Sequence, residues 1–168
     1  MSGANIDSLL RKIANGDNSA FETLYIRTSR GVYAFLYGYF HSHADTEDAM
    51  QTVYLKVKMG IGSYRAGTNG RAWLLQIAKN HALNELAKRK NTVSIDDFDI
   101  PVRENFDEGF TAELKKILTE EEYQIVTLHV LWKYKHREIA QMLACPTGTV
   151  TSKYKRAIAK LKARLKEE

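Results

Sequence analysis

Cysteine is almost absent from this sequence. The 168 residues contain one cysteine, Cys145, which excludes an internal disulfide and a cysteine-based zinc site. Long apolar runs are missing as well: no stretch of 18 apolar residues occurs, and the N-terminal residues lack the apolar core of a signal peptide. We therefore expect a cytoplasmic protein without membrane insertion.

The alternating pattern of a β-strand is also missing. Apolar residues instead recur at helical spacing from Ile6 to Lys90 and again from Leu114 onward. Between these blocks the period is lost, and residues 91–113 hold seven acids against one arginine. The sequence predicts an all-α protein with two small helical domains, 1–90 and 113–168, joined by a flexible acidic linker over 91–112.

Positive charge is concentrated at the C-terminal end. The whole chain carries a net charge of +5, but residues 133–168 hold ten lysines or arginines and only three acids. A basic module beside an acidic segment favours a polyanion-binding end. The alternative is that the basic and acidic segments are simply solvent-exposed faces of opposite charge that bind no polyanion.

The basic module reads as a helix-turn-helix. Ile139 and Leu143 lie on one face of a first helix, and Pro146 interrupts the helical backbone before a second helix begins. A scaffold hairpin with a basic face is the alternative. Lys160 and the cations after it are expected to pass the DNA backbone or enter solvent. Polar side chains suited to base edges and phosphates face outward from the second helix at Thr151, Ser152, Lys155 and Arg156.

An acidic helix start lies near residue 45, where Asp45 is the expected cap. Acids in a first turn complement the helix dipole by about 0.3–1 kcal/mol each, or the face could dock a basic partner helix. Both interpretations remain open. The acids and the amide one turn further along are Asp45, Glu47, Asp48 and Gln51.

A glycine-rich loop spans residues 60–70. It lacks the Gly-Lys-Ser/Thr ending of a phosphate-binding loop, so nucleotide hydrolysis is not favoured. Aromatic, cationic, hydroxyl and amide groups of such a loop can instead hold an unstacked nucleotide; a solvated connection is the alternative. The loop residues concerned are Tyr64, Arg65, Thr68 and Asn69, and the next helix adds Lys79, Asn80 and Asn84.

No catalytic constellation is evident. The five histidines are scattered, and His129 falls on an otherwise apolar helix, where a packed side chain is expected rather than a ligand. The sequence therefore predicts neither an enzyme nor a metal or cofactor site.

In their order and spacing, these segments resemble a bacterial RNA polymerase sigma factor of the extracytoplasmic-function (ECF) type, which keeps only regions 2 and 4. The likeness extends over roughly residues 5–165. It is carried by residues 17–25, 45–56, 63–65, 71–80, 118–121 and 138–157. The resemblance implies a non-enzymatic subunit that binds core polymerase, recognises the −10 and −35 promoter elements and promotes strand opening.

The resemblance also implies a role for each candidate residue. The clamp helices of the largest polymerase subunit would meet Asp45, Glu47, Asp48 and Gln51. A flipped base of the −10 element would lie in a pocket formed by Tyr64, Arg65, Thr68 and Asn69, flanked by Lys79, Asn80 and Asn84. The −35 element would be read by Thr151, Ser152, Lys155 and Arg156. The polymerase flap, promoter DNA and an anti-sigma factor are the further partners implied, and the acidic linker would follow the RNA path.

The sequence departs from the family pattern at three places. Thr151 stands where many relatives have a cation, residues 133–136 replace a glycine-containing stretch, and Ala144 replaces a common glycine in the turn. Two other functions compete with the sigma-factor interpretation: a stand-alone helix-turn-helix regulator acting as a homodimer, and a protein-interaction module with a basic helix. The salt dependence of binding separates these possibilities.

Overall fold

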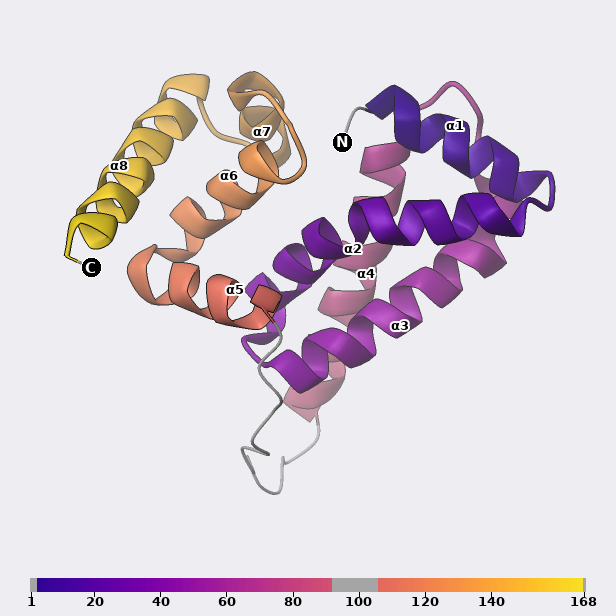
Figure 1. The fold of residues 1–168 in the computed structure, drawn as a ribbon, viewed down its shortest axis with the longest axis horizontal. Coiled ribbons are helices and arrows are strands. Elements are labelled where there is room, and N and C mark those ends of the chain that lie inside the picture. The colour runs from indigo at the N-terminus through magenta and orange to yellow at the C-terminus, as the bar shows by residue number, and fades with distance from the viewer. Residues whose placement is uncertain (1–2, 92–105, 168) are drawn as a thin grey trace. The chain divides into compact units, whose positions relative to one another are not determined.

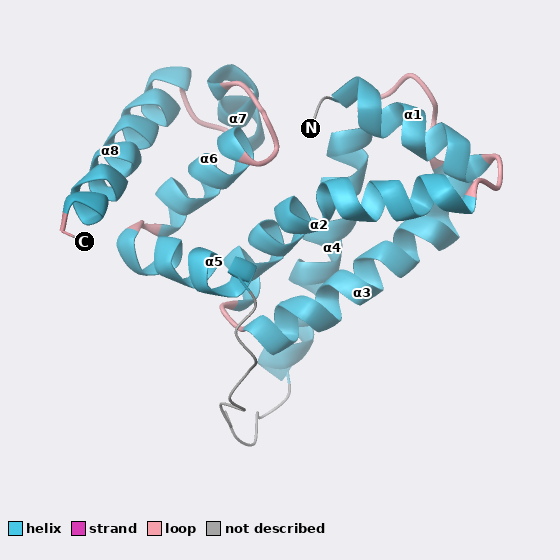
Figure 2. Ribbon diagram, viewed as in Figure 1, coloured by secondary structure: helices cyan, strands magenta, loops and turns pink. Residues whose placement is uncertain are grey.

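The computed structural model describes residues 3–91 and 106–167. Every regular element in these ranges is a helix (Figure 2), which confirms the predicted fold class. The chain divides into two compact units, Met1–Glu104 and Asn105–Glu168, here called unit 1 and unit 2. Residues 92–105, most of the predicted linker, lie outside the described residues.

Unit 1 is built around one long helix, α2, which contacts each of the other three α-helices of the unit (Figure 1). Its elements are α1 (Gly3–Ala14), α2 (Asn18–Phe40), α3 (His43–Gly60), the 3-10 helix η1 (Ile61–Ser63) and α4 (Gly70–Asn91). The apolar faces of these helices pack together into a core that includes the buried residues Leu10, Leu24, Leu36, Val53 and Leu74.

The α2–α3 connection corrects one prediction. The backbone turns at His41, whose φ of 55° is left-handed, and Ser42 is the N-cap of α3. The Ser42 hydroxyl accepts the Asp45 amide at 3.3 Å. Asp45 is therefore not the cap, and its carboxylate can pair elsewhere.

Unit 2 consists of α5 (Phe106–Ile117), α6 (Glu120–Val130), α7 (His136–Leu143) and α8 (Thr147–Lys166). Helix α8 contacts each of the other three helices. Trp132, Ile125, Leu128 and Ile139 are completely or almost completely buried, so the helix-turn-helix of α7 and α8 rests on an apolar core.

Helix α5 shortens the predicted linker. Because α5 begins at Phe106, residues 106–112 are helical rather than part of an irregular connection. Thr111, Leu114 and Leu118 recur at helical spacing and are all buried. The polar Thr111 breaks the apolar pattern while still occupying a buried position, which explains the error.

None of the helices in the described ranges is long and apolar enough to cross a membrane.

Candidate functional site

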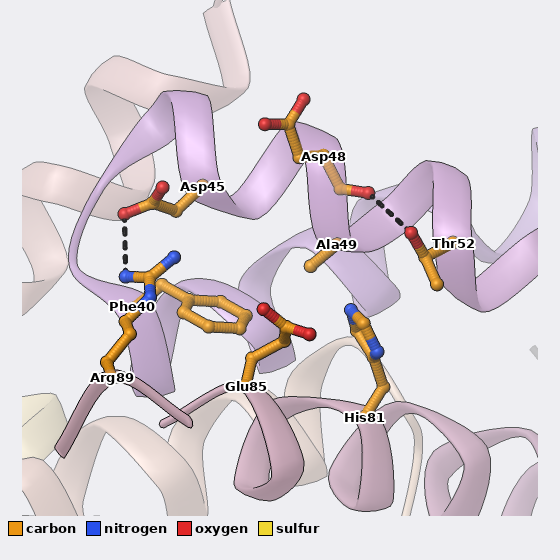
Figure 3. A pocket seen from close by; sticks show the side chains of 8 residues that line it. All are labelled: Phe40, Asp45, Asp48, Ala49, Thr52, His81, Glu85 and Arg89. Carbon is orange, nitrogen blue, oxygen red and sulfur yellow. Dashed lines mark hydrogen bonds and ion pairs between the residues drawn. The ribbon is translucent and has the colours of Figure 1, made fainter. Parts of the chain in front are cut away.

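The acidic face of α3 is only partly open. Asp48 and Gln51 are exposed and lie three residues apart, on one side of the helix. Asp45 instead pairs with Arg89 of α4, with 3.0 Å between its Oδ2 and the Arg89 Nη1 (Figure 3). The Arg89 guanidinium also lies 5.2 Å from the centre of the Phe40 ring. Asp45 thus joins two helices of unit 1 rather than standing free on the surface.

A small cleft of about 170 Å³ lies between α3 and α4 beside this ion pair. Asp48 and Thr52 border it from α3, and His81 and Glu85 border it from α4 (Figure 3). Burial, together with the nearby Lys56 ammonium, lowers the pKa of His81. Glu47, the fourth predicted residue of this face, is half-buried, with its Oε1 3.9 Å from the His43 Nε2.

The loop before α4 presents three of its four predicted residues. Arg65, Thr68 and Asn69 are exposed. The Thr68 hydroxyl donates to the Arg65 carbonyl at 2.6 Å, and the Asn69 side-chain oxygen accepts the Ala72 amide at 3.2 Å. These local bonds shape the loop and cap the start of α4 while leaving the Arg65 guanidinium at the surface.

Tyr64 does not fit its predicted role as a stacking platform. It is only 9% exposed, and its ring centre lies 5.1 Å from that of Trp73. Its hydroxyl donates to the carboxylate of Asp7 on α1. Burial and this neighbouring carboxylate raise the pKa of Tyr64 to about 12. Tyr64 is therefore a buried anchor of the loop in this structure.

Helix α4 continues the polar surface that begins in the loop. Lys79, Asn80 and Asn84 are all exposed, and Asn80 and Asn84 lie one turn apart on one face. The Asn80 side-chain oxygen accepts a hydrogen bond from Gln76 at 2.8 Å. Each of these groups can still turn toward a ligand, because a surface amide exchanges partners with water at little cost.

The helix-turn-helix exposes three of the four residues predicted to read DNA. Ser152, Lys155 and Arg156 are exposed and lie on one side of α8. Thr151 is half-buried, and its hydroxyl lies 3.0 Å from the Nδ1 of His136 on α7. The structure therefore gives Thr151 a packing role inside the motif.

Two of the three departures from the family pattern fall on left-handed backbone. Ala144, at the C-terminal cap of α7, has a φ of 53°, and Lys133, ahead of α7, has a φ of 60°. Only glycine adopts this conformation without strain. Both turns are therefore made here by residues that carry a Cβ, in a conformation that glycine would adopt without strain.

Three aromatic rings hold the two helices of the motif against α6. His129, His136 and Tyr154 lie pairwise 4.7–4.9 Å apart between ring centres. The Nδ1 of His129 lies 2.7 Å from the Tyr134 carbonyl oxygen, consistent with the predicted packed side chain. Burial and the adjacent His129 lower the pKa of His136. Among the described residues, no group of three or more His, Cys, Asp or Glu side chains is placed to hold a metal ion.

The acids that open α6 face cations of α8. Glu122, 2% exposed, binds the Lys160 Nζ through both carboxylate oxygens, at 2.8 and 3.1 Å, and Glu121 pairs with Lys153. Arg156 lines the groove between these acids and cations. Lys160 was expected to run past DNA or into solvent, and the structure corrects this: it is an internal partner of a buried carboxylate.

Three side chains that position these surfaces were missed from the sequence: Asp7, Arg89 and Glu122. Asp7 had one local signal, an acid between Ile6 and Leu9 on an apolar helix. Arg89 had none, because its partner Asp45 lies 44 residues away. Glu122 has capping-box spacing with Thr119, and the structure has this capping box, but nothing local indicates that Glu122 also binds Lys160, 38 residues away.

The helix-turn-helix of unit 2 places the chain among all-helical proteins that carry a DNA-binding motif. The comparisons with known families make this class specific. Residues 24–92 match the family described as Sigma-70 region 2, and residues 113–161 match Sigma-70, region 4. The two matches together cover more than half of the chain, which belongs to the sigma-70 family as an ECF sigma factor.

Curated relatives match along most of their length. The chain is 29% identical to the ECF RNA polymerase sigma-E factor of Escherichia coli (strain K12), over 89% of this chain and 88% of that protein. The sigma-E factor of Haemophilus influenzae is also 29% identical, over 89% of each chain.

Two solved structures share the fold. CnrH, in complex with the cytosolic domain of CnrY, aligns with a TM-score of 0.62 and 18% identity over 98% of this chain and 99% of that one. RpoE from Bartonella quintana, in complex with the anti-sigma factor NepR, aligns with a TM-score of 0.59 and 21% identity over 87% of this chain and 96% of that one.

The protein is thus a non-enzymatic sigma factor that directs promoter-specific transcription initiation with RNA polymerase. Polymerase and DNA are its partners.

Proposed function

We propose that unit 1 binds core polymerase and opens the −10 element, while unit 2 reads the −35 element. The observation that carries this proposal is the exposed side of α8, where Ser152, Lys155 and Arg156 follow a helix-turn-helix. A hydroxyl and two cations in this arrangement suit base edges and phosphates of a major groove. The polar loop of unit 1 supplies a second, separate nucleic-acid surface.

The polymerase-binding face consists of Asp48 and Gln51, with Glu47 at its edge. An exposed carboxylate and amide on one side of α3 complement a basic partner helix, and the clamp helices of the largest subunit are that partner. Asp45 supports this face indirectly, because its carboxylate is bound to Arg89. Unit 2 meets the flap of the polymerase.

The −10 surface is formed by Arg65, Thr68 and Asn69 of the loop together with α4 residues Lys79, Asn80 and Asn84. A guanidinium can stack on a displaced base, and amides can recognise its edge. Extruding one base costs a few kcal/mol, which these contacts would offset. Tyr64 serves this surface from within, as a support of the loop rather than as its stacking ring.

An anti-sigma factor is the regulator we propose, and the cytoplasm is the compartment. The support is that each of the two similar structures contains a second protein, and the second protein bound to RpoE is named as an anti-sigma factor. Transcription by RNA polymerase takes place in the cytoplasm of bacteria, which fixes the compartment of its partner.

Run-off transcription with core polymerase and a genomic template library tests the proposal. The expected result is a set of transcripts that share upstream −35 and −10 sequences and vanish without this chain. Transcripts identical to those of core polymerase alone would refute it.

A salt titration performed with and without core polymerase separates the proposal from its two rivals. Binding of holoenzyme to a promoter fragment should weaken steeply with salt, by about 0.9 logarithmic units per phosphate contact for each tenfold increase. A protein-interaction module would show no such dependence on DNA, and a stand-alone regulator would bind the −35 duplex equally well without polymerase.

A further inference from the structure

The loop proposed to capture the −10 base is anchored to α1. Asp7, on α1, is 8% exposed. A single carboxylate oxygen, Oδ1, accepts both the Tyr64 hydroxyl and, at 3.2 Å, the Gly67 amide. The other oxygen, Oδ2, pairs with Arg11 at 2.8 Å. One buried side chain therefore binds Tyr64, which directly follows η1, and Gly67, three residues further along the loop.

The end of the loop is held by the same helix. A Cβ on Gly70 would lie 3.1 Å from the Asp7 backbone nitrogen, from the Ile6 Cγ2 and from the Leu10 Cδ1. Glycine is what permits this close approach of α4 to α1. Gly67 has a φ of +86°, and this left-handed turn points its amide at Asp7.

These contacts leave the candidate DNA-binding side chains on the opposite side of the loop. Arg65, Thr68 and Asn69 are exposed, while Tyr64 and Gly70 beside them are buried. A loop with so few apolar contacts of its own is mobile unless it is held by its backbone and anchors. Preorganisation of a binding loop lowers the cost of ordering it when the ligand binds.

We propose that Asp7 is a positioning residue for promoter opening, which sets the shape of the −10 loop through Tyr64 and Gly67. This inference rests on the proposed function of the loop. Asp7 does not touch DNA. It acts by holding the backbone that carries Arg65, Thr68 and Asn69, so its loss should affect base capture and base preference rather than recruitment.

The test compares three variants in the full-length holoenzyme. Asp7→Ala removes both loop hydrogen bonds and should slow open-complex formation, followed by permanganate reactivity, by about tenfold, the effect of losing bonds to a charged acceptor. Asp7→Asn keeps an oxygen acceptor for Tyr64 and Gly67 but loses the negative charge and the Arg11 ion pair, so it should open promoters at least about threefold faster than Asp7→Ala without reaching the parental rate.

Asp17→Ala is the matched control. Asp17 is also a carboxylate of unit 1, and its Oδ1 caps α2 by accepting the Ser19 amide at 3.0 Å and the Ala20 amide at 3.2 Å. Its loss destabilises the same unit without touching the loop. All variants should keep parental affinity for core polymerase and for the −35 duplex. An opening defect in Asp17→Ala equal to that of Asp7→Ala would mean that general stability is responsible, and the proposal would fall.

Base preference gives a readout that mere destabilisation would not change. With a −10 library, Asp7→Ala should alter preference at one or two positions, whereas an even loss over all sequences would overturn the proposal. Tyr64→Phe removes the hydroxyl that donates to Asp7 and that also lies 3.4 Å from the Thr68 carbonyl oxygen. Added to Asp7→Ala, it should slow opening by less than it does in the parent, because the bond to Asp7 is already lost.

Arg65→Ala separates failure of this inference from failure of the proposed function. If Arg65→Ala slows opening and Asp7→Ala does not, the loop captures the base without help from Asp7, and this inference is wrong. If neither variant changes opening, the loop is not the capture site, and the proposed function of unit 1 falls together with the inference.

Discussion

Replacing Lys160 by methionine should destabilise unit 2 because it removes the partner of a buried carboxylate. Lys160 binds both oxygens of Glu122, at 2.8 and 3.1 Å, and the Thr119 amide binds Oε2 at 3.0 Å. Hydrogen bonds to a charged group contribute about 1.5–3 kcal/mol. The Lys160 side chain is 37% exposed, so water replaces part of the lost contact, and we expect a loss of about 1–2 kcal/mol in the free energy of unfolding.

Tryptophan fluorescence makes this loss measurable in the full chain. The sequence has two tryptophans, Trp73 in unit 1 and the fully buried Trp132 in unit 2. In a Trp73→Phe background, urea unfolding followed by fluorescence reports unit 2 alone. Lys162→Met is the control, because Lys162 is exposed, and it should change the stability by less than about 0.5 kcal/mol.

The dependence on pH tests the cause of the loss. Burial alone would raise the pKa of Glu122, but the hydrogen bonds from Lys160 and the Thr119 amide outweigh it and hold the pKa below its ordinary value. The stabilisation is therefore complete above the unfolded-state pKa of about 4.3 and disappears as the pH falls through the lowered folded-state pKa. The deficit of Lys160→Met should shrink over the same range. Equal losses for Lys160→Met and Lys162→Met, or a deficit that persists in acid, would refute the argument.

Three further predictions concern the surfaces and the turn. Ala144→Gly should raise the free energy of unfolding of unit 2 by about 1 kcal/mol, because glycine removes the strain of a φ of 53°; urea unfolding would show no gain if the turn were relaxed. Asp48→Lys should weaken core-polymerase binding about tenfold in a fluorescence titration. Asp45→Asn should mainly lower the free energy of unfolding of unit 1, by about 0.5–1 kcal/mol. Equal losses of polymerase affinity for the two variants would contradict the separate roles given to Asp48 and Asp45. Arg156→Ala should cost about 1–3 kcal/mol at one −35 position in a library of duplexes, and Lys166→Ala should have a small, even effect; identical profiles would mean that α8 only grips phosphates.

Local patterns were sufficient to predict most of the fold. Apolar spacing predicted helices in both units, and Pro146 placed the break between α7 and α8, because both signals depend on neighbours within a turn or two. The acidic start of α3 was likewise visible, but its cap was not, because Ser42 and Asp45 are both good caps and only the backbone decides between them.

The site was predicted less completely because its side chains bind partners far away in the sequence. Tyr64 has the composition of a stacking residue, and nothing within the loop indicates that a carboxylate 57 residues earlier binds its hydroxyl. Thr151 and Lys160 lie at outward-facing intervals on α8, yet His136 and Glu122 bind them across the unit. Sequence spacing alone correctly placed Ser152 and Lys155 on an exposed side of α8, and their contact with DNA stays a prediction.

Helix α1 has a practical consequence for hybrid proteins. The match to Sigma-70 region 2 begins at residue 24, whereas α1 spans Gly3–Ala14 and carries Asp7, which binds the loop that we propose captures the −10 base. A chimaera joined at residue 24 would receive the loop without the helix that holds it. Such a protein would recruit polymerase to the correct −35 sequence but open DNA poorly. A transfer of promoter specificity from this protein to another sigma factor should therefore include α1.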